Sequence, residues 1–360
     1  MLRHTLCVTL VAASLFADAA EQLGLPPKLA KLLERARTEP AAVAEELRLA
    51  TPHTRVQAAD YAPSAAPMSP AASLPIVVAH GMGDSCFNAG MEQITQQAGA
   101  HAGVYSTCIP TGANDIEDTI AGFLTNMDKS VEIFARKVRA DPKLANGFNA
   151  FGLSQGNNLI HGYQLKYNDP PVVSFISVCG INAGVGAIPQ CSPNASSPIL
   201  GPTLGPVCEA LAEVTGDAAN LKIVQDVLFQ ANYYRDPTGL NHTDFLRNNQ
   251  LAQWNGEGLP GSFNQTFKEN FLKTSTNVWV KGLLDTVVWP REGEWWGQVA
   301  PGDPWDGPAL PMAQSSWYLK DTFGLRTASQ QNKNHFESFM GEHIRIPDAQ
   351  LYSLISKYFK

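Results

Sequence analysis

Apolar residues follow two patterns along this chain. Some form continuous runs of about four to eight residues closed by glycine or a turn residue, which is typical of buried parallel strands. Others recur at a spacing of about three or four residues, which is typical of amphipathic helices. The patterns predict strands at 75–80, 148–153, 172–180, 277–285 and just before Gly341, and helices at 115–142, after Ser154 and at 348–359. Their alternation predicts an α/β fold, with a mostly parallel sheet and helices on both faces.

Two segments lie outside this alternation. Residues 181–276 are rich in Asn, Pro and Gly and carry a weak strand signal, so we expect a helical and loop insertion over the sheet. Residues 20–73 begin with helical spacing of Leu and Ala, interrupted at Pro40, and end in an Ala-, Ser- and Pro-rich stretch that has little to pack. We therefore expect a helical arm or pro-segment and a linker over 20–73, and one folded domain over 74–360.

The first residues have the features of a signal peptide. Arg3 supplies a basic start, residues 6–16 are mostly apolar, and Ala17 to Ala19 form a small-residue exit. The apolar stretch is shorter than the roughly 18 residues that a spanning helix needs, so we favour a cleaved signal over residues 1–19 to a membrane anchor. No later segment is apolar enough to span a bilayer.

The charge of the chain bears on its partners. Charged residues make up 16% of the sequence and the formal net charge is −7. The chain has no run of Lys or Arg that could follow a phosphate backbone, so we expect no nucleic-acid partner.

A secretory route changes how the cysteines are interpreted, because thiols then meet an oxidising compartment. Cys7 lies in the signal segment. Five cysteines remain, an odd number, so at least one is free or paired outside the chain: Cys86, Cys108, Cys179, Cys191 and Cys208. Three N-x-S/T sequons, at Asn194, Asn241 and Asn264, fit the same route and predict a glycoprotein of the secretory pathway.

A G-x-S-x-G pentapeptide, Gly152 to Gly156, stands between a predicted strand and a predicted helix. In this context the serine occupies a strained turn that exposes its hydroxyl at the carboxyl end of the sheet, and side chains at the two glycine positions would clash with neighbouring elements. Ser154 is therefore a candidate nucleophile. A serine in a tight turn without catalytic function is the alternative.

A serine nucleophile needs a base and a carboxylate, which follow it along the chain in α/β-hydrolases. Asp285 ends a predicted strand and is the candidate acid, with a turn-capping role as its alternative. His343 lies on a loop before the C-terminal helix and is favoured as the base over His335, which enters the last predicted strand.

An oxyanion hole is expected at the glycine-rich loop His80-Gly81-Met82-Gly83-Asp84-Ser85, together with the N–H of Gln155. Asp84 is expected to fix the loop by Asx-type hydrogen bonds, and His80 to be a packed loop histidine. The chain has no H-E-x-x-H, C-x-x-C or Walker motif, so we expect neither a metal nor a cofactor.

Five blocks of sequence together resemble the palmitoyl-protein thioesterases: HGMGDSCF (80–87), DPKLANGFNAFGLSQG (141–156), ISVCGINAGVGAIPQC (176–191), LLDTVVWPREGEWWG (283–297) and MGEHIRIP (340–347). The resemblance implies an α/β-hydrolase that removes long-chain acyl groups from cysteine thioesters, in lysosomes or after secretion. It places Ser154 on the family's nucleophile, Asp285 on its acid and His343 on its base. It places Met82 and Gln155 on the oxyanion positions.

The resemblance also implies a Cys191–Cys208 disulfide and a family sequon at Asn241. The family often has two adjacent cysteines after GMGDS, whereas Phe87 follows Cys86 here, so that local bridge cannot form. The pairing of Cys86, Cys108 and Cys179 stays open. Asn157 stands where the family commonly has glycine, a change expected to have little effect at a helix start. Residues 20–73 have no recognised counterpart.

The resulting hypothesis is a serine thioesterase acting on S-palmitoylated proteins or peptides through an acyl-serine intermediate. The alternatives are an acyl-CoA thioesterase or lipase-like esterase with the same triad, and more remotely a secreted binding protein without turnover. The sequence does not give the oligomeric state. Burial of the CH₂ groups of an acyl chain is favourable, so we expect an apolar groove that holds the chain. Its candidate lining residues, each of which ordinary core packing would also explain, are Ile181, Val185, Ile188, Phe229 and Trp254.

Overall fold

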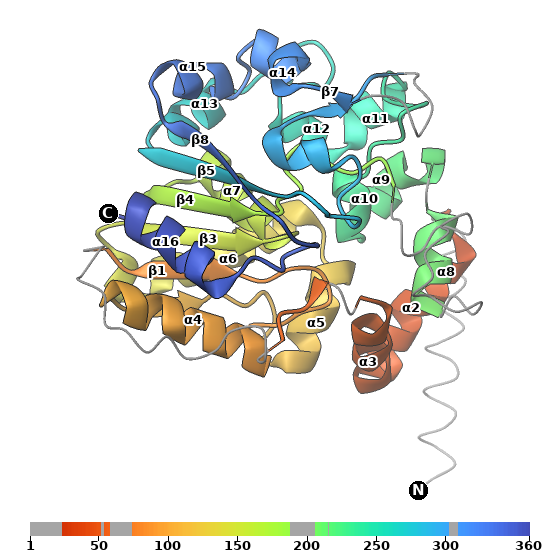
Figure 1. The fold of residues 1–360 in the computed structure, drawn as a ribbon. Helices are drawn as coiled ribbons and strands as arrows, with labels where there is room; N and C mark the ends of the chain where they lie inside the picture. Colours follow the sequence, from red (N-terminus) through yellow and green to blue (C-terminus); the bar gives the residue numbers. More distant parts are fainter. Residues whose placement is uncertain (1–23, 52–53, 58–73, 188–205, 215, 302–308) are drawn as a thin grey trace, which may run out of the picture.

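The computed structural model describes residues 24–51, 54–57, 74–187, 206–214, 216–301 and 309–360. A six-stranded sheet lies at its centre, in the order β2-β1-β3-β4-β5-β8, and every neighbouring pair is parallel (Figure 1). The strands are β1 (Ile76–Ala79), β2 (Ser106–Cys108), β3 (Phe148–Leu153), β4 (Val172–Val178), β5 (Thr276–Gly282) and β8 (Asn334–Phe339). The sheet confirms the predicted parallel arrangement. β2 was not predicted, because this three-residue strand at the sheet edge is only half-buried and lacks an apolar run.

Helices cover both faces of the sheet, as predicted. Alternate residues of β1 point to opposite faces. Val77 and Ala79 belong to one hydrophobic cluster, and Ile76 and Val78 belong to another. The first cluster lies under α6 (Met127–Ala140) and α7 (Gly156–Lys166), and the second under α4 (Ala89–Ala102) and α16 (Asp348–Tyr358), which lie together in front of the sheet in Figure 1.

The single helix predicted over 115–142 is wrong, because the structure forms two helices there. The first helix, α5, spans Asp115–Leu124, and α6 begins at Met127. The Asn126 side chain accepts a hydrogen bond from the N–H of Lys129, so it caps the second helix. A short 3₁₀ turn, η3 (Pro142–Leu144), follows.

The described part of the segment 181–276 consists of short helices joined by loops, and α9 to α12 gather at one end of the sheet (Figure 1). Its elements before β5 are α8 (Pro206–Glu213), η4 (Gly216–Asn220), α9 (Lys222–Gln225), α10 (Phe229–Tyr233), α11 (Thr243–Asn248), α12 (Gln250–Trp254) and α13 (Gln265–Leu272). The elements between β5 and β8 are η5 (Arg291–Trp295), the antiparallel pair β6 (Gln298–Val299) and β7 (Ala309–Leu310), η6 (Met312–Gln314), α14 (Ser316–Leu319) and α15 (Leu325–Gln330).

The N-terminal arm forms two helices, α2 (Pro27–Thr38) and α3 (Pro40–Ala50). They pack on α5 and α8 (Figure 1) and bury Leu29, Val43 and Leu47 in a cluster that also contains Met82. The helices match the predicted helical spacing, with the break at Pro40. The division into an arm and a domain near residue 74 stays a prediction.

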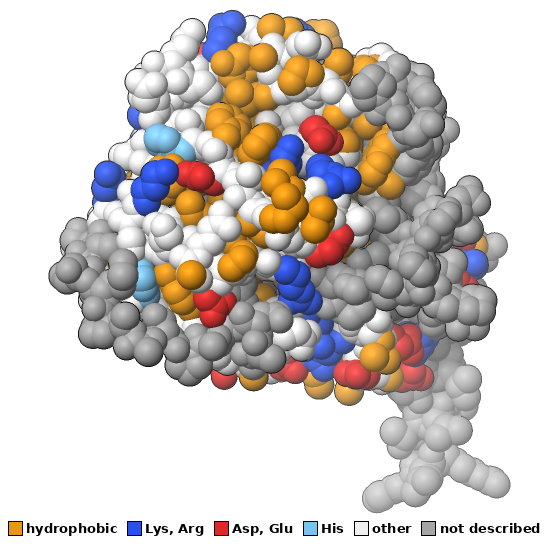
Figure 2. Space-filling model, viewed as in Figure 1, with side chains coloured by type: hydrophobic (Ala, Val, Ile, Leu, Met, Phe, Trp, Pro, Cys, Tyr) orange, Lys and Arg blue, Asp and Glu red, His pale blue; other side chains and the backbone are white. Residues whose placement is uncertain are grey.

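Surface charge is mixed on the face drawn in Figure 2. Lys and Arg side chains of the described residues are interspersed there with Asp, Glu and apolar side chains. The described residues of this face form no continuous stripe of basic side chains. Among the described helices, none is both long enough and apolar enough to cross a bilayer.

Candidate active site

Ser154 occupies a strained turn directly after β3. Its φ of 53° lies in the left-handed region, which side-chain-bearing residues rarely adopt. A Cβ at Gly152 would lie 2.4 Å from Asn157 Oδ1, and one at Gly156 would lie 2.4 Å from the backbone oxygen of Ala79. Both flanking positions therefore require glycine, as the sequence predicted.

Asn157 fastens this turn, and the expectation that it would have little effect overlooked its hydrogen bonds. Its side chain is fully buried, and Nδ2 donates to the backbone oxygens of Ser154, at 2.9 Å, and Val178, at 3.0 Å. These bonds tie the turn to the end of β4. A glycine at this position could not make them.

Asp285 and His343 form a buried pair. Asp285 follows β5, and its Oδ1 accepts the N–H groups of Val287 and Val288 at 2.7 and 2.9 Å. Its Oδ2 lies 2.5 Å from Nδ1 of His343. Burial opposes ionisation of Asp285, but the charge and hydrogen bond of His343 outweigh it and lower the pKa of Asp285 to about 2. Asp285 therefore stays an anion that orients the imidazole.

The other ring nitrogen of His343 is left available. Nε2 is buried and has no hydrogen-bond partner among the described residues. With Nδ1–H donated to Asp285, Nε2 of the neutral ring carries the lone pair that a general base needs. Ser154, Asp285 and His343 follow three parallel strands, β3, β5 and β8, so they share the carboxyl edge of the sheet. No hydrogen bond joins Ser154 to His343 in the described chain, which is common in structures without substrate.

His335 lies elsewhere, within β8, where the centroid of its ring lies 4.9 Å from that of Tyr358.

The sequence analysis did not place two buried groups beside the Asp285–His343 pair. The Cys179 thiol accepts the N–H of Ile344 at 3.3 Å, and burial raises its pKa, so it stays a neutral thiol. Its sulfur and the nearest ligand atoms of the pair all lie within 4.8 Å of one another.

Glu294 is the second overlooked group. It is fully buried, and its Oε2 accepts the N–H of Gly282 at 2.9 Å. Burial and the negative charge of Asp285 raise the pKa of Glu294 well above its ordinary value. A neutral carboxylic acid is therefore favoured next to the ionised Asp285. No local sequence pattern marks such a group, because its neighbour is brought to it by the fold.

The two expected oxyanion donors lie on well-held backbone. Neither Met82 nor Gln155 donates its N–H to an acceptor within the described residues. The side chain of Gln155 is anchored on both sides: Nε2 donates to the Gly122 oxygen at 2.7 Å, and Oε1 accepts from Gln230 at 2.9 Å and Tyr233 at 3.0 Å. The two N–H groups are thus left free while the residues that carry them are fixed.

A buried ion pair supports the loop of Met82. His80 Nδ1 lies 2.9 Å from the Gly81 oxygen, and Nε2 lies 3.2 Å from Asp118 Oδ2, a contact between charges rather than an aligned hydrogen bond. Burial disfavours the His80 cation, but Asp118 outweighs this and raises the pKa of His80 to about 9. Charged His80 donates its Nδ1–H to the Gly81 carbonyl. It is a packed loop histidine, as expected, with an ionic partner that the sequence did not reveal.

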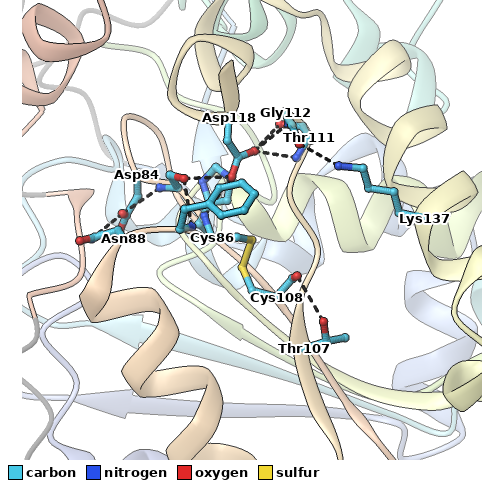
Figure 3. Close-up of a disulfide and its surroundings, with 12 residues drawn as sticks. Asp84, Cys86, Asn88, Thr107, Cys108, Thr111, Gly112, Asp118 and Lys137 are labelled. Atoms are coloured by element: carbon cyan, nitrogen blue, oxygen red, sulfur yellow. Dashed lines mark hydrogen bonds and ion pairs between the residues drawn. A yellow bond between two sulfur atoms is a disulfide. The ribbon is translucent and has the colours of Figure 1, made fainter. Parts of the chain in front are cut away.

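Asp118 also joins this loop to the segment that follows β2. It accepts the N–H groups of Cys86 at 2.9 Å, Thr111 at 2.6 Å and Gly112 at 3.0 Å (Figure 3). A Cys86–Cys108 disulfide crosses the same region, so these two cysteines pair with each other. Cys86 offers no thiolate to a metal in this state, although its sulfur lies near His80 and Asp118.

Several predicted residues fall in the core or outside the described chain. Asn241 and Asn264 are exposed, as acceptors of a glycan must be. Ile188, Cys191 and Asn194 lie outside the described residues, as does the signal segment, and the side chain of Cys208 is not described, so the Cys191–Cys208 bridge stays a prediction. The remaining acyl-groove candidates all belong to the main hydrophobic cluster: Ile181, Val185, Phe229 and Trp254. Their role in a groove stays a prediction.

The parallel sheet and the serine turn define an α/β-hydrolase. A family model described as palmitoyl protein thioesterase matches residues 75–343. The chain is 30% identical over 291 residues to palmitoyl-protein thioesterase 1 of Caenorhabditis elegans, covering 79% of this chain and 92% of that protein. It is 32% identical over 212 residues to palmitoyl-protein thioesterase 3 of Dictyostelium discoideum, covering 59% and 66%. The chain therefore belongs to the palmitoyl-protein thioesterase family and is a hydrolase of that class.

Among solved structures, the thioesterase domain from the curacin biosynthetic pathway matches with 12% identity and a TM-score of 0.33, over 80% of this chain and 92% of that one. This likeness is too distant to support a conclusion. The family model begins at residue 75, so the arm helices α2 and α3 lie outside it.

Proposed function

We propose that the protein hydrolyses the thioester between a long-chain fatty acyl group, such as palmitoyl, and a cysteine of a protein or peptide. The observation that carries this proposal is the Asp285–His343 contact of 2.5 Å at the sheet edge that also holds the strained Ser154 turn. Family membership supports the choice of substrate, since the relatives are named palmitoyl-protein thioesterases.

In the proposed reaction, His343 Nε2 takes the proton of the Ser154 hydroxyl as Oγ attacks the thioester carbonyl carbon. The N–H groups of Met82 and Gln155 stabilise the oxyanion of the tetrahedral intermediate. The carbon–sulfur bond then breaks, and the cysteine leaves with the proton returned by His343. A water molecule, deprotonated by the same nitrogen, hydrolyses the acyl-serine and regenerates the enzyme.

Asp285 supports both halves of the cycle. It holds Nδ1–H of His343, which fixes the tautomer with a free Nε2, and its charge stabilises the imidazolium that forms in each step. Glu294 interacts with Asp285 as a neutral acid, so it adds no second negative charge next to the Asp285–His343 pair. No cofactor or metal takes part in this scheme.

We further propose a secretory destination, in the lysosome or outside the cell. The signal-like segment over residues 1–19, the exposed Asn241 and Asn264, and the disulfide that joins Cys86 to Cys108 support it. In this proposal Asn194, Asn241 and Asn264 carry glycans. Digestion of the secreted protein with a glycosidase should release mass at these sites, and an unchanged mass would count against the proposal.

The decisive comparison uses three substrates: a palmitoyl-cysteine peptide, palmitoyl-CoA and a triglyceride. The proposal predicts the highest kcat/KM on the peptide. Preference for palmitoyl-CoA would support an acyl-CoA thioesterase, and preference for triglyceride a lipase-like esterase. If a fluorophosphonate probe failed to label Ser154, a binding protein without turnover would be the better description.

A further inference from the structure

The short segment that follows the arm, residues 54–57, lies against the oxyanion loop. Thr54 is fully buried, and its hydroxyl lies 2.5 Å from the Met82 oxygen and 2.9 Å from the Thr51 oxygen. The shorter contact is the one with the loop. A residue outside the matched family region thus contacts the residue whose N–H is an expected oxyanion donor.

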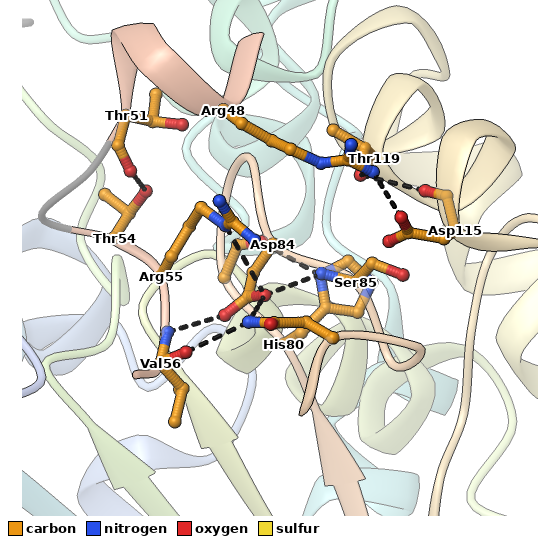
Figure 4. Close-up of polar contacts among 12 residues, drawn as sticks. Arg48, Thr51, Thr54, Arg55, Val56, His80, Asp84, Ser85, Asp115 and Thr119 are labelled. Atoms are coloured by element: carbon orange, nitrogen blue, oxygen red, sulfur yellow. Dashed lines mark hydrogen bonds and ion pairs between the residues drawn. The ribbon is translucent and has the colours of Figure 1, made fainter. Parts of the chain in front are cut away.

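Further contacts hold the same segment to the loop (Figure 4). The N–H of Val56 donates to Asp84 Oδ2 at 2.7 Å. The Val56 oxygen accepts from Nδ2 of Asn88, just before α4, at 2.9 Å. Arg55 Nε lies 4.0 Å from Asp84 Oδ1. Asp84 was expected to fix the loop through local hydrogen bonds. Besides its bond from the Ser85 N–H, it binds the loop to this segment.

The segment also touches the loop that carries His343. Arg345, two residues beyond His343, donates from Nη1 to the Arg55 oxygen at 3.2 Å. The segment also packs closely against Gly81 of the oxyanion loop. A Cβ at Gly81 would lie 3.1 Å from the Thr54 oxygen and 3.2 Å from Cβ of Ser154. Gly81 therefore lies between Thr54 and Ser154, with little room for either to shift.

The arm has its own anchorage, which keeps this segment in place. Leu29, Val43 and Leu47 are fully buried in the cluster shared with Met82. Arg48 Nη2 forms an ion pair of 2.6 Å with Asp115 on α5, which Figure 4 shows together with residues of the loop. The arm is thus fixed to the domain at several points before it reaches Thr54.

We propose that residues 27–51 and 54–57 are a positioning element for the oxyanion loop, with Thr54 as its main contact residue. The arm holds the backbone of Met82 so that its N–H points at the place where the oxyanion forms. This inference rests on the proposed function, because it assigns Met82 the role of a donor. Misplacement of a donor reduces transition-state stabilisation more than substrate binding, so the effect belongs in kcat.

The test compares Thr54→Val, which keeps the shape but removes the hydroxyl, with Thr54→Ser, which keeps the hydroxyl. Thr38→Val is the matched control, because among the described residues the Thr38 hydroxyl bonds within α2 alone, to the Glu34 oxygen at 3.1 Å. We expect kcat of Thr54→Val on a palmitoyl thioester to fall about 10-fold, less than the roughly 10²-fold or more of losing a donor outright, with KM within about twofold. Thr54→Ser and Thr38→Val should stay within about twofold of wild type.

Equal kcat for wild type and a folded Thr54→Val would overturn the proposal, as would a change confined to KM. The rate of Ser154 labelling by a fluorophosphonate separates this failure from that of the proposed function. If wild type labels but hydrolyses no palmitoyl thioester, the substrate assignment fails, and slower labelling of Thr54→Val still supports the positioning role. If Thr54→Val does not fold, Asn88→Ala takes its place with the same expected direction, because it removes the hydrogen bonds of the Asn88 amide to Val56 and to Asp84.

Discussion

His343 Nδ1 lies 2.5 Å from Asp285 Oδ2, and both side chains are buried. This contact leaves the opposite ring nitrogen without a partner in the described chain, on the sheet edge where the Ser154 turn ends β3. The geometry gives each residue of the proposed triad a separate task, and single substitutions can test each task.

Asp285→Asn should remove most activity while leaving the fold intact. The amide keeps the size of the side chain but favours the wrong imidazole tautomer and cannot stabilise the imidazolium. We expect kcat to fall about 10⁴-fold on a palmitoyl thioester. Circular dichroism would establish folding, and a kcat within tenfold of wild type would remove Asp285 from the triad.

Gly156→Ala should destabilise the protein and slow turnover. The added methyl would lie 2.4 Å from the Ala79 oxygen and 2.5 Å from the His80 oxygen, both of them backbone atoms. Overpacking of this kind costs about 1–3 kcal/mol in the free energy of unfolding. The matched control is Gly122→Ala in α5, where the nearest atoms lie at 3.8 and 3.9 Å, and we expect it to be neutral or stabilising. Urea titrations that ranked the two variants equally would contradict the steric account.

Alkaline pH should weaken the fold through His80. Its pKa is raised to about 9 from an ordinary 6.5, so its contribution to stability is complete below about pH 6.5 and is lost as pH rises through about 9. We expect the stability advantage of wild type over His80→Gln, measured by urea unfolding, to shrink across that window. An advantage that stays constant from pH 6 to pH 9.5 would show that His80 is neutral in the fold.

The Cys86–Cys108 disulfide closes a loop with a sequence separation of 22, next to the oxyanion loop. The chain-entropy relation gives a stabilisation of roughly 3 kcal/mol for such a loop. The double variant Cys86→Ser, Cys108→Ser should therefore lose about that much free energy of unfolding. The free energy of unfolding of wild type treated with a reductant should approach that of the double variant. Equal stability of all three samples would mean that the bond does not form in the protein.

Local sequence patterns were sufficient for much of the core and for the triad candidates. β3 and β4 are mostly apolar runs. The pentapeptide around Ser154 specifies its own turn, so neither these strands nor the turn needs distant contacts to be predicted. The break between α5 and α6 was not predicted, because the helical spacing of apolar residues continues across it, although Asn126 is a residue type that favours helix caps.

Other features depend on residues that the fold brings together from distant parts of the chain. His80 and Asp118 form an ion pair although a helix and a strand separate them in the sequence. Thr54 contacts Met82 although the predicted linker lies between them, and the length of a linker does not show where the arm packs. Glu294 acquires its raised pKa only because Asp285 is placed beside it. Such pairings carry no periodicity and no local motif, so single-sequence reasoning could not supply them.

The most direct test of the central claim is the steady-state hydrolysis of a palmitoyl-cysteine peptide by wild type and by Ser154→Ala. The account predicts turnover by wild type and a loss of about 10⁴-fold or more in the variant, whose buried site and Asp285–His343 pair should otherwise remain unchanged. Turnover by Ser154→Ala equal to that of wild type would contradict the account.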